Sequence, residues 1–277
     1  MNTEPKNTYL VVGWADPGLV GIKVTNYLKE KLNAKEFYEM DLHGLFSVSG
    51  VMIKDDYVSL PPTGGRLYRW SGKDGDIIIF MGSEWPNQAY EFNEKILDLA
   101  DQLKIKRIYT VGGIYTRVPH TRKPRISAVV NKSELKRYLK VYGIELGMDY
   151  HGPSSMNGCL IGLAKNRGIE GISLWGEVPH YVHQLVPQLP NPKVSQALLK
   201  VLASMLNLRI DFSDIDRETE YGERAIEKFV NQLKQDPGFK GYIEELEKNY
   251  DEYIVSESVE SEELFKEIEN FLKKKEG

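Results

Sequence analysis

The chain has 277 residues, of which 41% are hydrophobic and 27% are charged. This is the composition of an ordinary globular protein that can bury a sizeable core. The formal net charge of −4 at pH 7 supplies no basic surface to neutralise phosphates, which disfavours a nucleic-acid-binding protein. The single cysteine, Cys159, excludes an intrachain disulfide and a Cys-x-x-Cys metal site, and it suits a reducing compartment.

The sequence also argues against a membrane protein. Its longest strongly apolar run, residues 77–81, is far shorter than the roughly 20 residues that a membrane-spanning helix needs. Residues 1–6 lack the basic and apolar regions of a secretory signal. We therefore expect a protein of the cytoplasm that binds neither nucleic acid nor membrane.

The N-terminal part of the chain alternates between predicted strands and helices. An apolar run over 8–13 ends in glycine, and apolar residues at helical spacing follow over 20–28, which predicts a strand, a turn and a helix. Alternation over 36–41 predicts a second strand, and the Pro- and Gly-rich stretch around 61–65 predicts a loop or hairpin. The uniformly apolar residues 76–82 predict a strand at the centre of a parallel sheet, covered on both faces.

The same alternation continues in the second half of the chain. An apolar stripe over 92–103 predicts a helix, and 107–113 predicts the strand that completes a second βαβ unit. A helix is predicted over 156–164, a strand over 171–175 and a long closing helix up to Met205. The predicted fold class is α/β, with a mostly parallel sheet and helices on both of its faces.

The character of the sequence changes near Phe212, after which strongly charged helical sequence continues to the end. We expect an α/β core domain over 1–212 and a charged helical C-terminal extension over 213–277. Leu264, Ile268 and Phe271 recur on one face of this extension, which predicts that it docks. The docking surface is either the chain's own core or another subunit.

Three chemically rich segments follow predicted strands, at the edge of the sheet where α/β proteins usually bind ligands. In the first, Gly13 and Gly18 flank Asp16 in a strand-to-helix turn of a kind that can hold an anion. It is not a P-loop, because no lysine follows the second glycine, and its glycines are spaced too widely for the dinucleotide fingerprint. The alternative interpretation is a purely structural turn.

In the second segment, Arg117, His120 and Arg122 follow the glycine pair 112–113. The two arginines are suited to bind a carboxylate or phosphate through paired hydrogen bonds, with His120 as a proton donor. The alternative is that both arginines pair with carboxylates of this chain or of another subunit, while His120 hydrogen-bonds the loop.

In the third segment, Glu177 and His180 follow the predicted strand over 171–175, and His183 comes three residues later. Two histidines and a glutamate raise the hypothesis of a metal site. Pro179 and the absence of His-Glu-x-x-His spacing argue against it. No Ser-His-Asp order and no Gly-x-Ser-x-Gly elbow is present. We predict no metal, no cofactor and no assembled catalytic group.

Taken together, these segments resemble the proteasome assembly chaperone 2 family in its archaeal and bacterial form. The matching stretches follow one another over about residues 8–212. They are Gly-Trp-Ala-Asp-Pro-Gly-Leu-Val-Gly over 13–21, Gly-Gly-Ile over 112–114, Val-Pro-His-Thr-Arg over 118–122, Gly-Pro-Ser-Ser over 152–155 with Asn157 and Gly158, Val-Pro-His-Tyr over 178–181, and Pro-Asn-Pro over 190–192. The stretch 246–251 is similar to the helical tail of bacterial members.

The resemblance implies a three-layer αβα fold akin to that of nucleoside phosphorylases, and subunits that associate with one another. In eukaryotic relatives it implies chaperoning of proteasome α-ring assembly. Archaeal relatives that engage the proteasome end in a tail of a hydrophobic residue, tyrosine and any residue, whereas residues 273–277 of this chain are Lys-Lys-Lys-Glu-Gly. That docking motif is absent, which argues against direct docking on proteasome α subunits.

The leading hypothesis is therefore a homo-oligomeric protein-binding protein, not an enzyme, that is similar to proteasome assembly chaperones and has proteasome α subunits as candidate partners. The alternative is a small-molecule-binding enzyme of the phosphorylase or hydrolase type that uses the loops at the strand ends. The candidate ligand- or partner-binding residues are Gly13, Asp16, Gly18, Arg117, His120, Arg122, Glu177 and His180.

Overall fold

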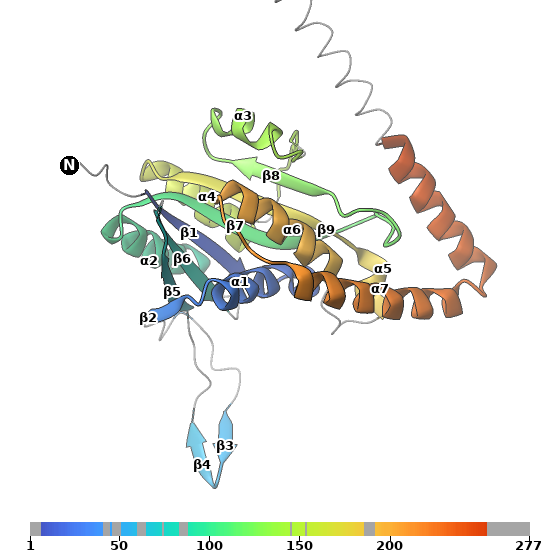
Figure 1. Ribbon diagram of the computed structural model, residues 1–277, viewed down its shortest axis with the longest axis horizontal. Coiled ribbons are helices and arrows are strands. Elements are labelled where there is room, and N and C mark those ends of the chain that lie inside the picture. Colours follow the sequence, from blue (N-terminus) through green and yellow to red (C-terminus); the bar gives the residue numbers. More distant parts are fainter. Residues whose placement is uncertain are drawn as a thin grey trace, which may run out of the picture.

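A computed structural model describes residues 7–40, 45, 51–59, 65–73, 75–82, 88–144, 146–152, 154–185 and 192–253. In this part of the chain, a seven-stranded sheet has the strand order β2-β5-β6-β1-β7-β9-β8 (Figure 1). Its four central strands are parallel to one another: β6 (Gly75–Gly82), β1 (Asn7–Trp14), β7 (Ile105–Thr116) and β9 (Glu170–Pro179). The predicted strands over 8–13, 76–82, 107–113 and 171–175 all lie in this parallel centre.

Antiparallel strands complete the sheet on both sides. They are β5 (Gly65–Ser71) beside β6, β2 (Lys35–Met40) beside β5, and β8 (Ile126–Val130) beside β9. A hairpin of β3 (Met52–Lys54) and β4 (Tyr57–Ser59) forms a second, separate sheet. The sequence analysis predicted β2 but neither β5, β8 nor this hairpin. Of the predicted loop around 61–65, only Gly65 lies within the described residues.

Two pairs of helices cover the two faces of the sheet. Helices α1 (Val20–Lys31) and α6 (Pro192–Met205) lie on one face, and α2 (Ala89–Gln102) and α4 (Met156–Asn166) lie on the other. Successive residues of a strand point to opposite faces, so Val11 packs in the core with α1 and α6 while Leu10 and Val12 pack with α2 and α4. The predicted three-layer αβα fold is confirmed. The short helices are η1 (Pro17–Leu19), α3 (Leu135–Lys140) and α5 (His180–Leu185).

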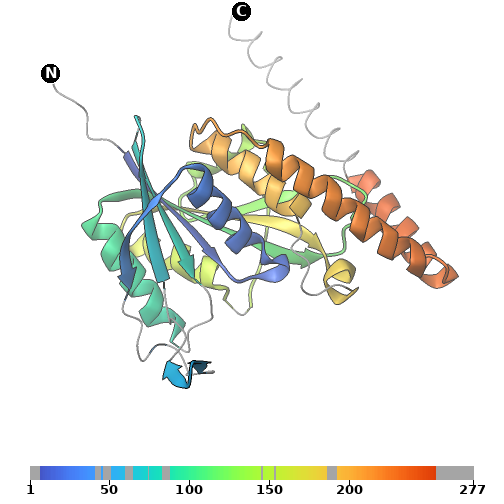
Figure 2. The same ribbon diagram turned by 60° about the horizontal axis from the view of Figure 1, so that its bottom comes forward.

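The chain then leaves the sheet through two further helices. Helix α7 (Ser213–Leu233) runs along α6, and a helix over 237–253 turns back from its end (Figure 2). An apolar cluster separate from the two faces of the sheet joins both helices to the start of α5. It contains Tyr181, Val182, Ile226, Val230, Ile243 and Leu246. The amphipathic stripe predicted over 264–271 lies outside the described residues. No helix of the described residues is long and apolar enough to cross a membrane.

The close contact between β1 and α1 yields a test of this architecture. A Cβ at Gly13 would lie 2.4 Å from the carbonyl oxygen of Gly21 and 2.6 Å from Cγ2 of Thr25. Because a backbone atom blocks the space, Gly13→Ala is expected to destabilise the protein by about 1–3 kcal/mol, measured by urea unfolding. The control is Gly162→Ala in α4, where nothing lies within 4 Å of the added atom. It should be neutral or stabilising by up to about 1 kcal/mol. Equal stability of the two variants would contradict the close contact.

Candidate functional site

The turn after β1 is held by the partly buried carboxylate of Asp16. Its oxygens accept the backbone N–H of Gly21 at 3.0 and 3.2 Å and that of Gly113 at 2.5 Å. Burial raises the pKa of Asp16 to about 7, although these N–H groups oppose the shift. Gly18 and Leu19 have left-handed φ angles of 70° and 54°, which bend the chain from the strand into α1. Asp16 thus connects the first helix to the seventh strand.

A cavity opens beside this carboxylate, at the carboxyl ends of β1, β7 and β9. Its volume is about 430 Å³. Its lining includes Trp14, Asp16, Tyr115, Ser155, Asn157 and Trp175. Helix α4 begins at this cavity, where Oγ of Ser155 caps it by accepting the N–H of Gly158 at 3.0 Å.

Two polar side chains of the cavity lining lie close to the backbone of Gly112. A Cβ at this position would lie 2.7 Å from Oδ2 of Asp16, 2.9 Å from Nδ2 of Asn157 and 3.4 Å from the ring of Trp175. Any residue but glycine would therefore displace this arrangement.

The arginines of the second candidate segment face the C-terminal helices. Nε and Nη2 of Arg122 each lie 2.9 Å from one carboxylate oxygen of Asp251, which is a paired, two-hydrogen-bond contact. Arg117 is largely exposed and lies 4.0 Å from Glu245. Oγ1 of Thr121, between them, donates a hydrogen bond of 2.7 Å to Glu247. Both arginines therefore contact carboxylates of the helix over 237–253.

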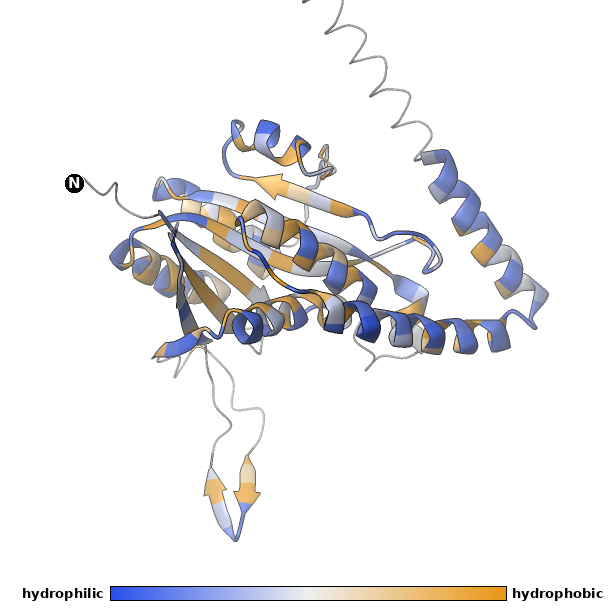
Figure 3. Cartoon of the chain, in the orientation of Figure 1, coloured by the Kyte–Doolittle hydropathy of each residue, from blue (hydrophilic) through white to orange (hydrophobic). Residues whose placement is uncertain are grey.

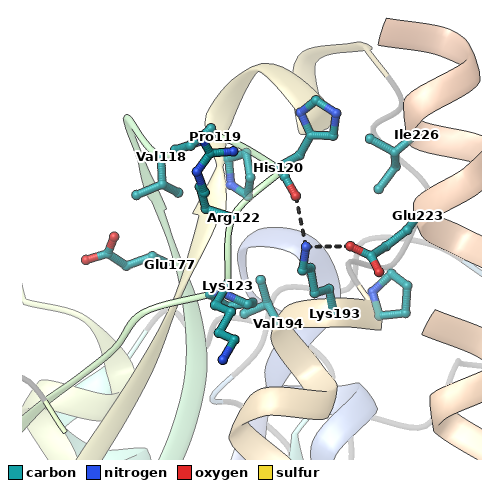
Figure 4. A pocket seen from close by; sticks show the side chains of 13 residues that line it. Val118, Pro119, His120, Arg122, Lys123, Glu177, Lys193, Val194, Glu223 and Ile226 are labelled. Carbon is teal, nitrogen blue, oxygen red and sulfur yellow. Dashed lines mark hydrogen bonds and ion pairs between the residues drawn. The ribbon is translucent and has the colours of Figure 1, made fainter. Parts of the chain in front are cut away.

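His120 is enclosed by the same helices. The hydroxyl of Tyr181 accepts the backbone N–H of His120 at 2.7 Å, so its own proton points to Nδ1, 2.5 Å away, and Nε2–H faces Glu227 at 2.9 Å. Burial lowers the pKa of His120, and Glu227 opposes this shift. The carbonyl oxygen of His120 accepts a hydrogen bond from Lys193, which also pairs with Glu223 (Figure 4). This histidine links the loop to α5, α6 and α7.

Glu177 and His180 also form contacts within the chain. Glu177 accepts hydrogen bonds from Nε and Nη2 of Arg125 at 3.0 and 2.8 Å and from Oγ1 of Thr116 at 3.3 Å. Nδ1 of His180 lies 3.3 Å from the carbonyl oxygen of Thr116, and Nε2 lies 3.2 Å from the hydroxyl of Tyr242. Among the described residues, no three His, Cys, Asp or Glu side chains are grouped so that they could hold a metal ion.

We call residues 116–125, with Glu177 and His180, the C-terminal clamp, because they hold α7 and the helix over 237–253. The space enclosed there, between His120, Glu177 and Lys193, has a volume of about 20 Å³, which is room for about one water molecule (Figure 4). The clamp is thus a packed junction.

The eight candidate residues fall into two places. Gly13, Asp16 and Gly18 form the turn beside the cavity, whereas Arg117, His120, Arg122, Glu177 and His180 belong to the C-terminal clamp. Of the polar and aromatic residues of the cavity, only Asp16 was among the candidates; Trp14, Tyr115, Ser155, Asn157 and Trp175 were not. Asn157 stands in one of the stretches that carry the family resemblance, and Trp175 stands at the end of a predicted strand.

Comparison with known proteins identifies the fold and the family. The model of the PAC2 family matches residues 10–230, a range that includes the whole cavity lining and the loop of the C-terminal clamp. The chain belongs to the PAC2 family. The resemblance inferred from the loop motifs is therefore confirmed.

Individual relatives are distant in sequence but cover most of the chain. An uncharacterized protein of Methanocaldococcus jannaschii is 23% identical over 228 residues, which is 81% of this chain and 84% of that protein. PbaB of Pyrococcus furiosus, an archaeal proteasome activator, is 26% identical, with a TM-score of 0.69 over 82% of this chain and 95% of its own. A proteasome-assembly chaperone homologue of Mycobacterium tuberculosis is 22% identical, with a TM-score of 0.72 over 85% and 99%.

The C-terminal clamp gives a prediction with a matched control. Arg122→Ala removes the paired contact with Asp251, so amide hydrogens over 237–253 should exchange severalfold faster, because this helix then opens more often. Arg117→Ala removes only a long, exposed contact and should leave the exchange unchanged. Hydrogen exchange read by mass spectrometry measures both variants. Equal protection in the two would mean that Arg122 does not hold the helix.

Proposed function

We propose that this chain is a homo-oligomeric, protein-binding protein of the cytoplasm that acts as a proteasome-assembly-chaperone-like factor. Family membership supports this proposal, as does the similarity to PbaB, a proteasome activator, over 82% of the chain. The engagement of Arg117, His120 and Arg122 by the chain's own helices supports it as well. These three residues form the most chemically rich loop of the sequence, and here His120 and Arg122 hydrogen-bond the C-terminal helices while Arg117 makes only a long, exposed contact with them.

The observation that carries the proposal is the exposed β3–β4 hairpin. Its side chains Ile53, Tyr57 and Val58 are 71%, 81% and 68% exposed. Ile53 and Val58 lie opposite each other across the two strands, and Figure 3 shows apolar residues on both strands, apart from the main sheet. A two-stranded hairpin is marginally stable by itself, and exposed apolar residues that cluster in this way mark protein contacts.

The turn of the hairpin defines its shape. Asp55 and Asp56 both have left-handed φ angles, of 50° and 63°, as a type I′ turn between two strands requires. The turn therefore holds the strands in the register that pairs Ile53 with Val58. The hairpin offers the same apolar surface on every copy of the chain, which is what a symmetric interface between identical subunits needs. We assign its partner surface to a second copy.

The hairpin is tested by removing its apolar side chains together. The variant Ile53→Ser, Tyr57→Ser and Val58→Ser should weaken self-association at least about tenfold, because roughly 1.4 kcal/mol or more of apolar burial is lost. Size-exclusion chromatography with light scattering measures the mass over a dilution series. The control is Val141→Ser with Tyr221→Ser, which changes apolar side chains that are 82% and 77% exposed on the core and on α7.

The possible results of this experiment separate the claims. A wild-type chain that is monomeric at high concentration contradicts homo-oligomerisation itself. A triple variant that keeps the wild-type mass assigns the interface to another surface. Circular dichroism of each variant verifies that the α/β core stays folded, which is expected because the hairpin belongs to a separate sheet.

The partner is tested separately, with the tagged full-length chain expressed in its native host. Mass spectrometry of the captured complexes should recover proteasome α subunits at a level well above that of a tag-only control. The triple hairpin variant, analysed in parallel, shows whether self-association is needed for this capture. Recovery of the bait alone would contradict the proteasome-related part of the proposal.

A further inference from the structure

The cavity beside Asp16 has the position and size of a ligand site. After β1, the chain forms β2, β5 and β6 on one side of β1 and then crosses to β7 on the other side. The cavity lies at this point, where the strand order reverses. Ligands of open α/β sheets bind outside the carboxyl ends of the strands at such points. The volume of about 430 Å³ is within the range of small-molecule pockets.

Two residues of the cavity lining, Asn157 and Trp14, each carry a fully buried polar atom that has no hydrogen-bond partner among the described residues. Asn157 is 3% exposed and its Oδ1 accepts no hydrogen bond, while Trp14 is 4% exposed and its Nε1 has no acceptor. Both residues line the cavity. Because nearly all buried polar groups in proteins are satisfied, the unsatisfied amide of Asn157 can turn to hydrogen-bond a ligand in the cavity, whereas Trp14 packs against Phe80 and Phe92.

The polar groups are also held in place. The backbone N–H groups of Gly21 and Gly113 fix the carboxyl of Asp16, and Asn157 is fixed in the first turn of α4. A Cβ at Gly112 would lie within 3 Å of both Oδ2 of Asp16 and Nδ2 of Asn157, so the two groups lie close together there. In this arrangement the carboxyl can accept an N–H from a ligand, and the neighbouring amide can donate a second hydrogen bond to the ligand or accept one from it.

The charge of the cavity selects among ligands. Among the described residues that line it there is no lysine, arginine or histidine side chain, and Asp16 is the one acidic residue. An anionic ligand would meet this carboxyl without a compensating cation, so phosphates and carboxylates are disfavoured. A neutral or cationic ligand is compatible with the site.

The aromatic lining selects for shape. Trp14, Tyr115 and Trp175 are among the lining residues; Tyr115 and Trp175 are the more exposed of them, whereas Trp14 packs against Phe80 and Phe92. Rings of this kind stack on flat ligands and attract cations over their faces. We propose that this cavity binds a planar, nitrogen-containing aromatic ligand, uncharged or cationic, that donates an N–H to Asp16 and satisfies the side chain of Asn157.

The test uses probes that differ in charge but share a shape. Benzamidine is a planar cation with N–H donors, benzoate is its anionic counterpart, and adenine is an uncharged planar heterocycle. Each is added at about 1 mM to the ¹⁵N-labelled full chain. We expect benzamidine or adenine to shift the indole N–H signals of Trp14 and Trp175 and to leave that of Trp70 unchanged, and we expect benzoate to shift none. Trp→Phe variants assign the signals.

Two variants test the polar groups. Gly112→Ala places a methyl group in the space between Asp16 and Asn157, and Asn157→Leu keeps the volume but removes the amide. Each should weaken probe binding at least about tenfold, the loss expected from one hydrogen bond to a charged or buried group. Gly162→Ala, in an open position of the same helix, should bind the probes like the wild type.

Several results would overturn this proposal. They are the absence of any shift with both benzamidine and adenine, benzoate binding as tightly as benzamidine, and unchanged probe binding in Asn157→Leu, which does not depend on whether Gly112→Ala folds. None of these results bears on the hairpin, whose readout is the mass of the assembly. The test of the ligand site and the test of the oligomer are therefore independent of each other.

Discussion

The structure depends on the contact that Asp16 makes with two backbone N–H groups. One belongs to Gly21 at the start of α1 and the other to Gly113 near the end of β7. Because the carboxylate accepts both, the first helix lies directly against the sheet. A Cβ at Gly21 would be 2.7 Å from the carbonyl oxygen of Val111, so the helix and strand backbones are in contact there. The position of α1 fixes the edge of the cavity and the start of the face on which α6 packs.

The C-terminal helices are attached by a different kind of interaction. A small apolar cluster around Tyr181 and Ile226 supplies the burial, and the C-terminal clamp supplies directed hydrogen bonds and ion pairs. Exposed ion pairs contribute little individually, so the orientation of these helices comes from the paired and enclosed contacts of Arg122 and His120. Strand β9 takes part in both regions, since Trp175 lines the cavity and Glu177 holds Arg125 in the clamp.

Periodicity predicted the parts of the fold in which burial is uniform along an element. The residues of β6 and of α2 have strong patterns because each packs on the sheet over its whole length. Strand β2 also lies outside the parallel centre but was predicted from its alternating sequence, whereas β5 and β8 were missed because several of their residues are only partly buried and their pattern is weaker. The pairing of His120 with Glu227 links positions 107 residues apart, which no local pattern reveals. For the same reason the sequence does not reveal that Asp16 and Asn157 line one cavity.

Some glycines at the strand ends are needed for packing of the fold, whereas another is explained by the side chains around the cavity. Added Cβ atoms at Gly13 and Gly21 would meet backbone oxygens, so the packing of α1 on the sheet accounts for both. At Gly112 the nearest atoms all belong to side chains, those of Asp16, Asn157 and Trp175. Side chains can be exchanged or turned away at little cost to the fold, whereas backbone cannot. The glycine at 112 is therefore explained by the close approach of a carboxyl, an amide and a ring that line the cavity.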